Sequence, residues 1–179
     1  QGDDLGQRPA ADPRGHAAAA VGRVDPVVDG SDREVVSVAR EVVARGHALG
    51  NHTLTHPRMD RMSNPARQFE IEQMASVLNE LGAHPDPLFR PPYGHMSPGL
   101  LLFCLRHRHV VAYWSRDSFD FRLSGPEVVR EFRERPVAAG DIVLFHDDGS
   151  TAADALAELL PMWSASGFTF PSLTLPARH

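Results

Sequence analysis

The chain has 179 residues, about the length of one ordinary domain, and its composition, 42% hydrophobic and 23% charged, is typical of globular proteins. A formal net charge of -5 with no run of Lys or Arg argues against nucleic acid or an anionic membrane surface as a partner, because both are bound by a basic face. No apolar stretch approaches the roughly 20 residues of a membrane-spanning helix. We therefore expect residues 1–179 to form a single domain without a membrane span.

Two helices are predicted in the first half of the chain from capping residues followed by apolar residues at helical spacing. The first follows the pair Ser31 and Glu34 and ends at Gly46. The second opens at Pro65 and ends before Gly82. Their predicted apolar faces are Val35, Val38, Ala39, Val42 and Val43, and then Ile71, Met74, Ala75, Leu78 and Leu81.

Three further helices are predicted from their N-terminal residues alone. Their expected starts are Ser97 with Pro98, Ser124 with Glu127, and Thr151 with Asp154. The single cysteine, Cys104, falls in the apolar run 100–105. We expect a core thiol there rather than a nucleophile, and one cysteine provides no disulfide framework.

Short apolar runs between the helices are predicted to be buried strands, at 48–51, 88–89, 109–114, 142–145 and 168–170. Strands that alternate with helices imply a parallel sheet, open or closed into a barrel, and catalytic groups of such folds gather at the carboxyl ends of the strands. Polar residues follow the predicted strands at those ends. They are Asn51 with His52, Arg90, Asp117 with Asp120, and His146 with Asp147.

The first chemical motif is a pair of histidines four residues apart, His52-Thr53-Leu54-Thr55-His56. At this spacing two imidazoles can reach one metal ion from a single helical turn. The structural alternative, in a chain with 10 histidines, is a cap or a satisfied polar contact. Zinc proteases place Glu directly after the first histidine, where this chain has Thr53, so a base and a third ligand must come from elsewhere.

Three further motifs follow the histidine pair along the chain. They are Arg90-Pro91-Pro92-Tyr93-Gly94, Trp114-Ser115-Arg116-Asp117-Ser118-Phe119-Asp120, and Leu144-Phe145-His146-Asp147. Together with GHALGNHTLTHP at 46–57, these motifs resemble the polysaccharide deacetylase family, also called the NodB homology domain or carbohydrate esterase family 4. The resemblance extends from about Val35 to the end of the chain. Phe121 stands where the family usually has Trp.

The first family motif is where this chain departs from the pattern. The family has Thr-Phe-Asp-Asp-Gly-Pro at the end of its first strand, and this chain has Gln1-Gly2-Asp3-Asp4-Leu5-Gly6. The aspartate pair is in register with the histidines, whereas its flanking residues differ and the preceding strand is missing. We expect Asp3 and Asp4 to be the motif; the alternative is a solvated terminus, which would leave the site without its base and one ligand.

The resemblance implies a divalent metal ion held by Asp4, His52 and His56. Zinc is expected first, with cobalt or nickel as alternatives. Asp3 would be the general base that takes the proton of the attacking water. Arg90 would keep that carboxylate ionised by its opposite charge.

The remaining motif residues receive roles in the tetrahedral intermediate and its collapse. The backbone N–H of Tyr93 would meet the oxyanion, and His146 would protonate the leaving amine. Asp120 would orient His146, as carboxylates do in hydrolase triads. Trp114 and Leu144 would wall the pocket for the acetyl methyl group.

Each of these roles has a structural alternative. Arg90 could be a surface ion-pair partner, Asp120 a turn residue as Asp117 is expected to be, and His146 a cap. Trp114 and Leu144 fit a core equally well. The other histidines are expected at the surface or in turns; they include His16, His84, His95, His107, His109 and His179.

By resemblance, the fold is expected to be α/β, a distorted (β/α) barrel of about seven parallel strands whose first strand is truncated or degenerate. The expected function is metal-dependent removal of an N-acetyl or O-acetyl group from an acetylated amino sugar or polysaccharide. One alternative is a deacylase of a non-polysaccharide amide or ester, such as a secondary metabolite. The other, suggested by the altered first motif, is a carbohydrate-binding relative whose catalysis has decayed.

Location and assembly are less constrained by the sequence. The resemblance favours a secreted or cell-surface protein, and a cytoplasmic one is left open. The chain opens on Gln1 rather than Met, which leaves open a processed start, including removal of a signal peptide. No pattern indicates an oligomeric state.

Overall fold

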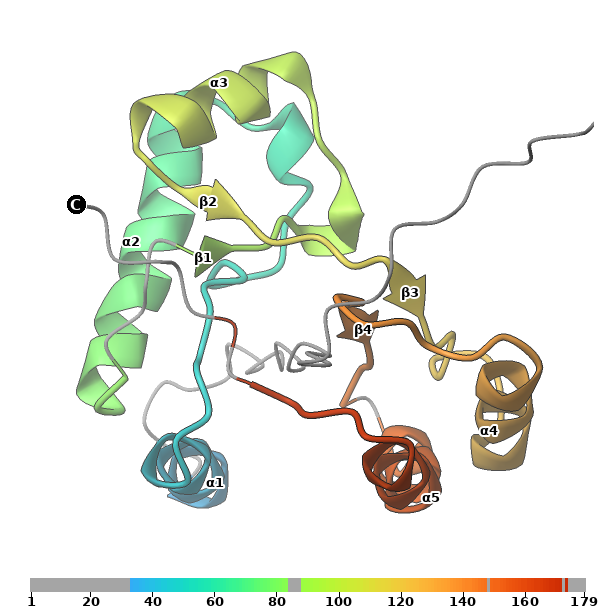
Figure 1. The fold of residues 1–179 in the computed structure, drawn as a ribbon. Helices are drawn as coiled ribbons and strands as arrows, with labels where there is room; N and C mark the ends of the chain where they lie inside the picture. Colours follow the sequence, from blue (N-terminus) through green and yellow to red (C-terminus); the bar gives the residue numbers. More distant parts are fainter. Residues whose placement is uncertain (1–32, 84–87, 148, 172, 174–179) are drawn as a thin grey trace, which may run out of the picture.

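The computed structural model describes residues 33–83, 88–147, 149–171 and 173, and within these ranges helices alternate with short strands (Figure 1). No helix in this part of the chain is long and apolar enough to cross a membrane. In chain order the elements are α1 (Arg33–Ala44), the 3-10 helix η1 (Met59–Arg61), α2 (Asn64–Glu80), β1 (Leu88–Phe89), the 3-10 helix η2 (Pro92–Gly94), α3 (Pro98–Arg106), β2 (Val110–Val111), β3 (Arg116–Asp117), α4 (Gly125–Glu134), β4 (Val143–Leu144) and α5 (Thr151–Ala165).

All five predicted helices are present, and side-chain caps explain where α3 and α4 begin, while the predicted cap Ser31 lies outside the described residues. The Oγ of Ser97 accepts a hydrogen bond from the third residue of α3 at 3.2 Å. At α4 the predicted capping box forms, because Glu127 Oε2 accepts the backbone N–H of Ser124 at 2.8 Å. The N-cap of α5 is Ser150 rather than the predicted Thr151. The side chain of Ser150 donates to Asp154 at 3.0 Å, so the predicted acidic partner is correct although the cap is one residue earlier.

The strands pair in parallel in two separate two-stranded sheets. In the first, Leu88 of β1 lies opposite Val110 of β2; in the second, Arg116 of β3 lies opposite Val143 of β4. Parallel strands need a crossover connection, and α3 and α4 provide the two crossovers. Asn51 adds an isolated parallel bridge to β1 through Phe89. The polar residues of the candidate site follow the carboxyl ends of these strands.

The predicted strand at 88–89 is confirmed as β1, whereas the other predicted strands are longer than those of the structure. Run 48–51 contributes only the bridge at Asn51, and run 168–170 only a bridge residue at Thr169. β3 was not predicted, because its two residues are polar and half-buried. An apolar run indicates that its residues are buried, whereas a β-strand also requires hydrogen bonds to a neighbouring strand. The described residues therefore show a parallel α/β arrangement, and a closed barrel of about seven strands is not confirmed.

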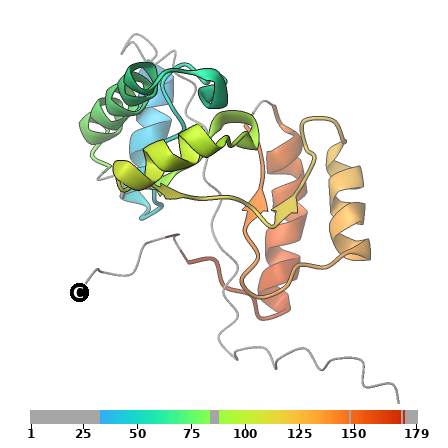
Figure 2. The same cartoon turned by 90° about the horizontal axis from the view of Figure 1, so that it is seen from above.

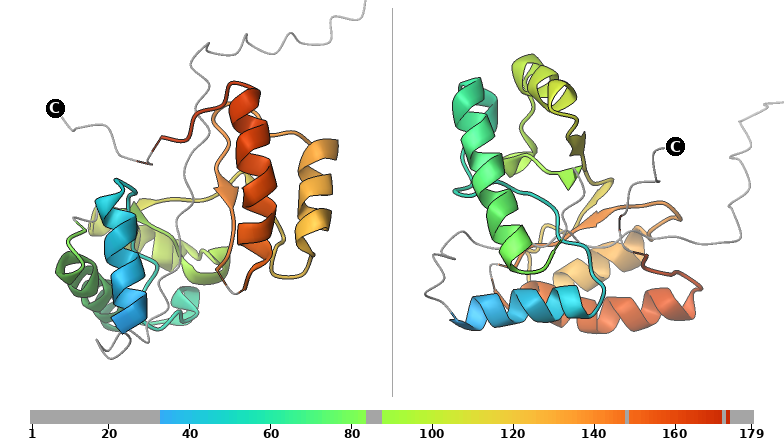
Figure 3. Two further views of the ribbon diagram at one scale, coloured as in Figure 1. Left: turned by 90° about the horizontal axis from the view of Figure 1, so that it is seen from below. Right: turned by 90° about the vertical axis from the view of Figure 1, so that its left-hand side faces the viewer.

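The helices cover the strands from two sides. α1 and α5 run along one end of the molecule, where they are seen end-on in Figure 1 and lengthwise in the right-hand view of Figure 3. α2 and α3 gather at the opposite end in both views. α4 and α5 lie side by side next to β4 (Figure 2).

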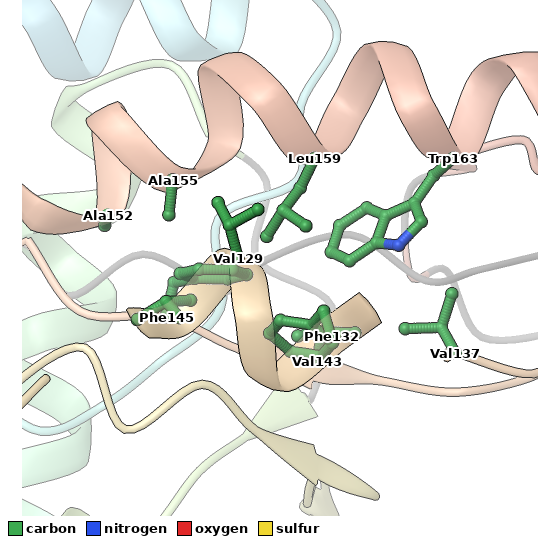
Figure 4. Close-up of a cluster of buried hydrophobic side chains, with 10 residues drawn as sticks. Val129, Phe132, Val137, Val143, Phe145, Ala152, Ala155, Leu159 and Trp163 are labelled. Carbon is green, nitrogen blue, oxygen red and sulfur yellow. The ribbon is translucent and has the colours of Figure 1, made fainter. Parts of the chain in front are cut away.

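The larger hydrophobic core joins α4, β4 and α5 (Figure 4). Trp163 of α5 packs edge-on against Phe132 of α4, with ring centroids 5.3 Å apart. Phe145, which directly follows β4, is buried in the same cluster. Truncation of a buried aromatic such as Phe132 to Ala costs about 3–5 kcal/mol. This core fixes the strand end from which His146 projects.

A second core packs α2 and α3 against β1, with Ile71, Phe89, Phe103 and Cys104 at its centre. Cys104 is buried, and its burial raises the pKa of the thiol, so the predicted core cysteine is confirmed. This core holds β1 and therefore the position of Arg90, the residue that follows it.

Two predictions about side-chain placement are wrong. Val38 was expected on the buried face of α1, but it is 59% exposed while its neighbour Ala39 is buried. The apolar stripe of α1 is wider than the surface against which the helix packs. His109, expected at the surface, is half-buried, with its ring centroid 6.1 Å from those of Phe89 and Phe103. Its position just before β2 carries it under α3.

Candidate active site

The segment that carries the histidine pair is a loop, so the expected helical turn is wrong. Asn51 first pairs with β1 through its own main chain, and its side-chain Oδ1 then accepts the backbone N–H of Thr53 at 3.0 Å. Thr53 and His56 have φ angles of 74° and 56°, in the left-handed region that a right-handed helix excludes. The two imidazoles are therefore brought together by the tight turn after the Asn51 bridge and not by a helical turn.

Glu70 of α2 holds this loop in place. Its carboxylate accepts the backbone N–H groups of Leu54 and Thr55 at 3.0 and 2.8 Å, and the Thr55 hydroxyl at 2.7 Å. Glu70 is buried, so these donors replace the water that the carboxylate loses. Sequence reasoning missed Glu70, although a glutamate on the otherwise apolar side of a helix was a signal that could have found it.

The two imidazoles lie next to each other, with ring centroids 4.9 Å apart at an interplanar angle of 69°. His52 Nδ1 lies 2.7 Å from the carbonyl oxygen of Arg90. A carbonyl oxygen can only accept, so Nδ1 carries the proton and Nε2 keeps its lone pair for a ligand. A backbone carbonyl behind Nδ1 is the usual outer partner of a metal-binding histidine.

This donor set fits part of a zinc-type site. Two imidazole nitrogens satisfy half of a tetrahedral coordination shell, and a carboxylate is the usual third ligand in catalytic sites. Among the described residues, no group of three His, Cys, Asp or Glu side chains comes together to hold a metal ion. The predicted ligand Asp4 and the predicted base Asp3 lie outside the described residues.

Arg90 is buried beside the histidines rather than exposed as a surface ion-pair partner. Its Nε donates to the carbonyl of Ala112 at 3.0 Å, and its guanidinium lies over the ring of Trp114 at 5.5 Å. Its Nη2 is buried and has no hydrogen-bond partner among the described residues. Burial lowers the pKa of this guanidinium. A buried cation with an unused donor is suited to an anionic partner, which is the chemistry predicted for Asp3.

Tyr93 lies against His56, and Trp114 lies against the turn that carries Tyr93. The Tyr93 ring packs edge-on against His56, with centroids 4.6 Å apart, and the residue adopts a φ of 59°. At Gly94, which also has a positive φ, a Cβ atom would lie 2.7 Å from the Trp114 ring. Tyr113 donates its hydroxyl to the Gly94 carbonyl at 3.1 Å. The Trp114 ring lies against the turn that follows Arg90, so this turn requires glycine at position 94.

The second half of the site joins Asp120, which follows β3, to His146, which follows β4. Asp120 Oδ1 lies 2.8 Å from His146 Nδ1, and Oδ2 accepts the backbone N–H of His146 at 2.7 Å. The carboxylate is buried and the imidazole is about one-third exposed. Nδ1 donates to the carboxylate, which leaves Nε2 as the nitrogen available to a substrate. The predicted pairing of the two residues is confirmed as a contact, while its catalytic role stays a prediction.

Two neighbours complete this half. Phe121 packs edge-on against the His146 ring at 5.2 Å. Ser118, which sequence reasoning passed over, donates its hydroxyl to Asp120 at 2.8 Å. Leu144 is buried in β4, two residues before His146, so it contributes to the core as its structural alternative stated. Its predicted contact with an acetyl group stays a prediction.

Comparison with known proteins matches this arrangement to one family. The sequence model described as polysaccharide deacetylase matches residues 26–107. A peptidoglycan-N-acetylglucosamine deacetylase of Bacillus cereus is 23% identical over 145 residues, which cover 79% of the chain. The chain is thus similar in sequence to the polysaccharide deacetylase family. Of that relative's own length the match covers 52%, so the chain spans about half of the curated protein.

Solved structures of the family share the fold. Peptidoglycan deacetylase PdaC from Bacillus subtilis aligns with a TM-score of 0.74 at 22% identity, over 90% of this chain and 75% of that one. A family 4 pseudoenzyme from Bacillus anthracis aligns with a TM-score of 0.69 at 20% identity, over 79% of this chain and 50% of that one. The NodB-type (β/α) fold is thus common to deacetylases and pseudoenzymes, and activity has to be argued from the site residues.

Proposed function

We propose that this chain is a metal-dependent deacetylase that removes an acetyl group from an acetylated amino sugar of a polysaccharide such as peptidoglycan or chitin. The observation that carries the proposal is that both halves of the site are built: the adjacent His52 and His56, and the Asp120–His146 pair. A binding protein that had lost catalysis would have no need to keep both. The relatives' activity on peptidoglycan supports the choice of substrate class.

The metal ion is proposed to be held by His52, His56 and Asp4, with zinc as the first expectation and cobalt or nickel as alternatives. When bound, such an ion polarises a carbonyl oxygen and acidifies a water molecule. The Arg90 carbonyl supports such a site because it selects the Nδ1–H tautomer of a neutral His52 ring, in which Nε2 is the nitrogen without a proton. Glu70 contributes to the proposed metal site by fixing the loop that carries both histidines.

Proton removal from water is assigned to Asp3. The buried guanidinium of Arg90, with its Nη2 unpartnered in the described part of the chain, would stabilise the ionised form of that carboxylate. The same cation lies over the Trp114 ring and is fixed by the Ala112 carbonyl, so it is held in one orientation. The backbone N–H of Tyr93 is proposed to donate to the oxyanion of the tetrahedral intermediate.

Protonation of the departing amine is assigned to His146. An amine leaves poorly from a tetrahedral intermediate unless it is protonated, and imidazole is the side chain that most often supplies the proton near neutral pH. Asp120 fixes Nδ1 of His146 and stabilises a positive charge on the ring. The partial exposure of His146 lets a substrate reach the remaining ring nitrogen.

Two other functions remain as alternatives. The same site would serve a deacylase acting on a non-polysaccharide amide or ester, including a secondary metabolite. A catalytically decayed carbohydrate-binding protein is favoured by one specific observation, the similarity to a family 4 pseudoenzyme together with the altered sequence around Asp3 and Asp4.

The test is to supply short N-acetylglucosamine oligomers to the zinc-loaded protein and to measure released acetate together with new free amine. Oligomers should react, and the monosaccharide should react slowly, because binding of neighbouring sugars helps to position the amide. Equal rates on both would remove the polysaccharide part of the proposal. Oligomer binding without acetate release, with zinc, cobalt and nickel each supplied, would favour the decayed relative.

A further inference from the structure

Ser118 is a fully buried residue to which the proposed mechanism assigns no role. Its backbone N–H donates to the carbonyl of Leu144 at 3.1 Å, which extends the pairing of β3 with β4 by one residue. The residue is therefore fixed to the strand that leads directly to His146. Its side chain hydrogen-bonds to Asp120, which lies two residues further along the chain.

The Ser118 hydroxyl shares an acceptor with His146. Its Oγ donates to Asp120 Oδ1 at 2.8 Å, and the same oxygen accepts His146 Nδ1–H at 2.8 Å. The other oxygen, Oδ2, accepts the backbone N–H of His146 at 2.7 Å. The Asp120 side chain is only 2% exposed, so water has no access to replace a lost donor.

We infer that Ser118 is a positioning residue for His146, acting through the carboxylate of Asp120. A carboxylate held only by His146 can rotate with that imidazole. A third donor that comes from a separate, strand-anchored residue fixes the carboxylate relative to the fold. His146 is about one-third exposed, and of the described side chains Phe121 also packs on its ring, so we expect the Asp120 anchor to direct its second ring nitrogen. The inference rests on the proposed function, since it assigns Ser118 to the step that His146 carries out.

A purely structural role for Ser118 predicts different behaviour. If the hydroxyl only satisfied a buried carboxylate, its removal would weaken folding and would lower every activity of the protein alike. A positioning role predicts a loss that is confined to the step needing His146 and that disappears when His146 is absent. Non-additivity between the two positions separates these cases.

The experiment uses the zinc-loaded chain with Ser118→Ala, which removes the hydroxyl with the smallest change of volume. Ser118→Thr and Ser118→Val form a matched pair, since both add similar bulk and only Thr keeps the hydroxyl. Each variant is also made with His146→Ala. Rates are measured on an N-acetylglucosamine oligomer and on an aryl acetate ester, whose phenolate leaves with little need of a proton donor.

We expect Ser118→Ala to lower kcat on the amide about tenfold, the effect of losing one buried hydrogen bond, and to leave KM within about twofold. Ester cleavage should change by less than about threefold. Ser118→Thr should exceed Ser118→Val by about the same tenfold on the amide. With His146→Ala present, Ser118→Ala should add no further loss. Equal losses on both substrates, or the same loss with and without His146, would overturn the inference.

A measurement without turnover distinguishes this inference from the proposed function. Solvent exchange of the His146 Nδ1–H proton is followed by NMR, with His146→Ala used to assign the signal. The rate should rise severalfold in Ser118→Ala and Ser118→Val and return toward the wild-type value in Ser118→Thr. Unchanged exchange would overturn the positioning role even in an active enzyme. A wild-type protein that releases no acetate but shows this exchange pattern would overturn the proposed function while retaining the positioning of His146 by Ser118.

Discussion

Glu70 and Thr55 are joined by two hydrogen bonds, in which one carboxylate oxygen accepts the Thr55 backbone N–H at 2.8 Å and the other accepts its hydroxyl at 2.7 Å. Thr55 directly precedes His56, and Glu70 belongs to α2. A helix thus supports the loop that presents both predicted imidazole ligands. Glu70 has no proposed contact with the metal or the substrate, but we expect it to control the position of both histidines.

Glu70→Ala is expected to lower the free energy of unfolding by about 1–3 kcal/mol, because it removes three hydrogen bonds between a buried carboxylate and the loop. Zinc affinity should fall about 10- to 100-fold, as for other residues that orient metal ligands. Urea unfolding and zinc titration check the two effects. Glu72→Ala, which removes an exposed carboxylate from the same helix, is the control and should leave both quantities close to wild type. A Glu70 variant with normal zinc affinity would contradict the proposed support.

His52→Ala and His56→Ala should each abolish stoichiometric zinc binding and all turnover, because each removes one of three proposed ligands. Elemental analysis after mild dialysis measures the metal content. The exposed His95→Ala is the control and should keep one zinc per chain. A wild-type protein that retains no zinc, cobalt or nickel under these conditions would end the hydrolase proposal.

His146→Ala should keep the metal but lose amide hydrolysis by about 10²–10⁴-fold, the usual contribution of a positioned acid. Aryl acetate cleavage should suffer much less, because a phenolate leaves without prior protonation. Comparison of kcat on both substrates, together with metal content, provides the measurement. Loss of zinc from this variant, or equal damage to ester and amide, would show that His146 is a ligand or a structural residue instead.

Arg90→Lys should lower kcat/KM about 10- to 100-fold, the range found for residues that support a metal site. Lysine keeps the charge but loses both the Nε bond to Ala112 and the position of the guanidinium over the Trp114 ring. Circular dichroism is needed beside the kinetics, because burial of a displaced ammonium is costly. Arg106→Lys, at an exposed position, should behave as wild type. Full activity in Arg90→Lys would mean that charge alone is sufficient.

His109 provides a prediction about stability. Burial first, and then the neighbouring His107, lower the pKa of His109 below its ordinary value of 6.5. The unfolded chain therefore binds this proton more readily than the folded chain, and the free energy of unfolding should fall as the pH drops below 6.5. Urea unfolding near neutral pH and at mildly acidic pH measures the loss. His109→Gln should lose less over this range, whereas His47→Gln, at an exposed position, should follow the wild type.

The sequence alone determined the helices and the residues that follow the strands. Helix starts such as Ser97 and the Ser124–Glu127 box were predictable, because a cap and its helix are encoded within a few neighbouring residues. The motifs also named His52, Arg90 and His146 correctly as residues that the fold would place at strand ends. Asp3 and Asp4 stay predictions, since they lie outside the described residues.

Only the tertiary structure decided how those residues are held. His52 meets the Arg90 carbonyl across 38 residues, Glu70 meets Thr55 across 15, and Asp120 meets His146 across 26. No local pattern encodes such pairs, because they form only when separate helices and strands pack against one another. The same reason explains why the histidine pair occupies a loop with positive φ angles: its conformation is set by the bridge at Asn51 and the carboxylate of Glu70, and not by the spacing of the two histidines.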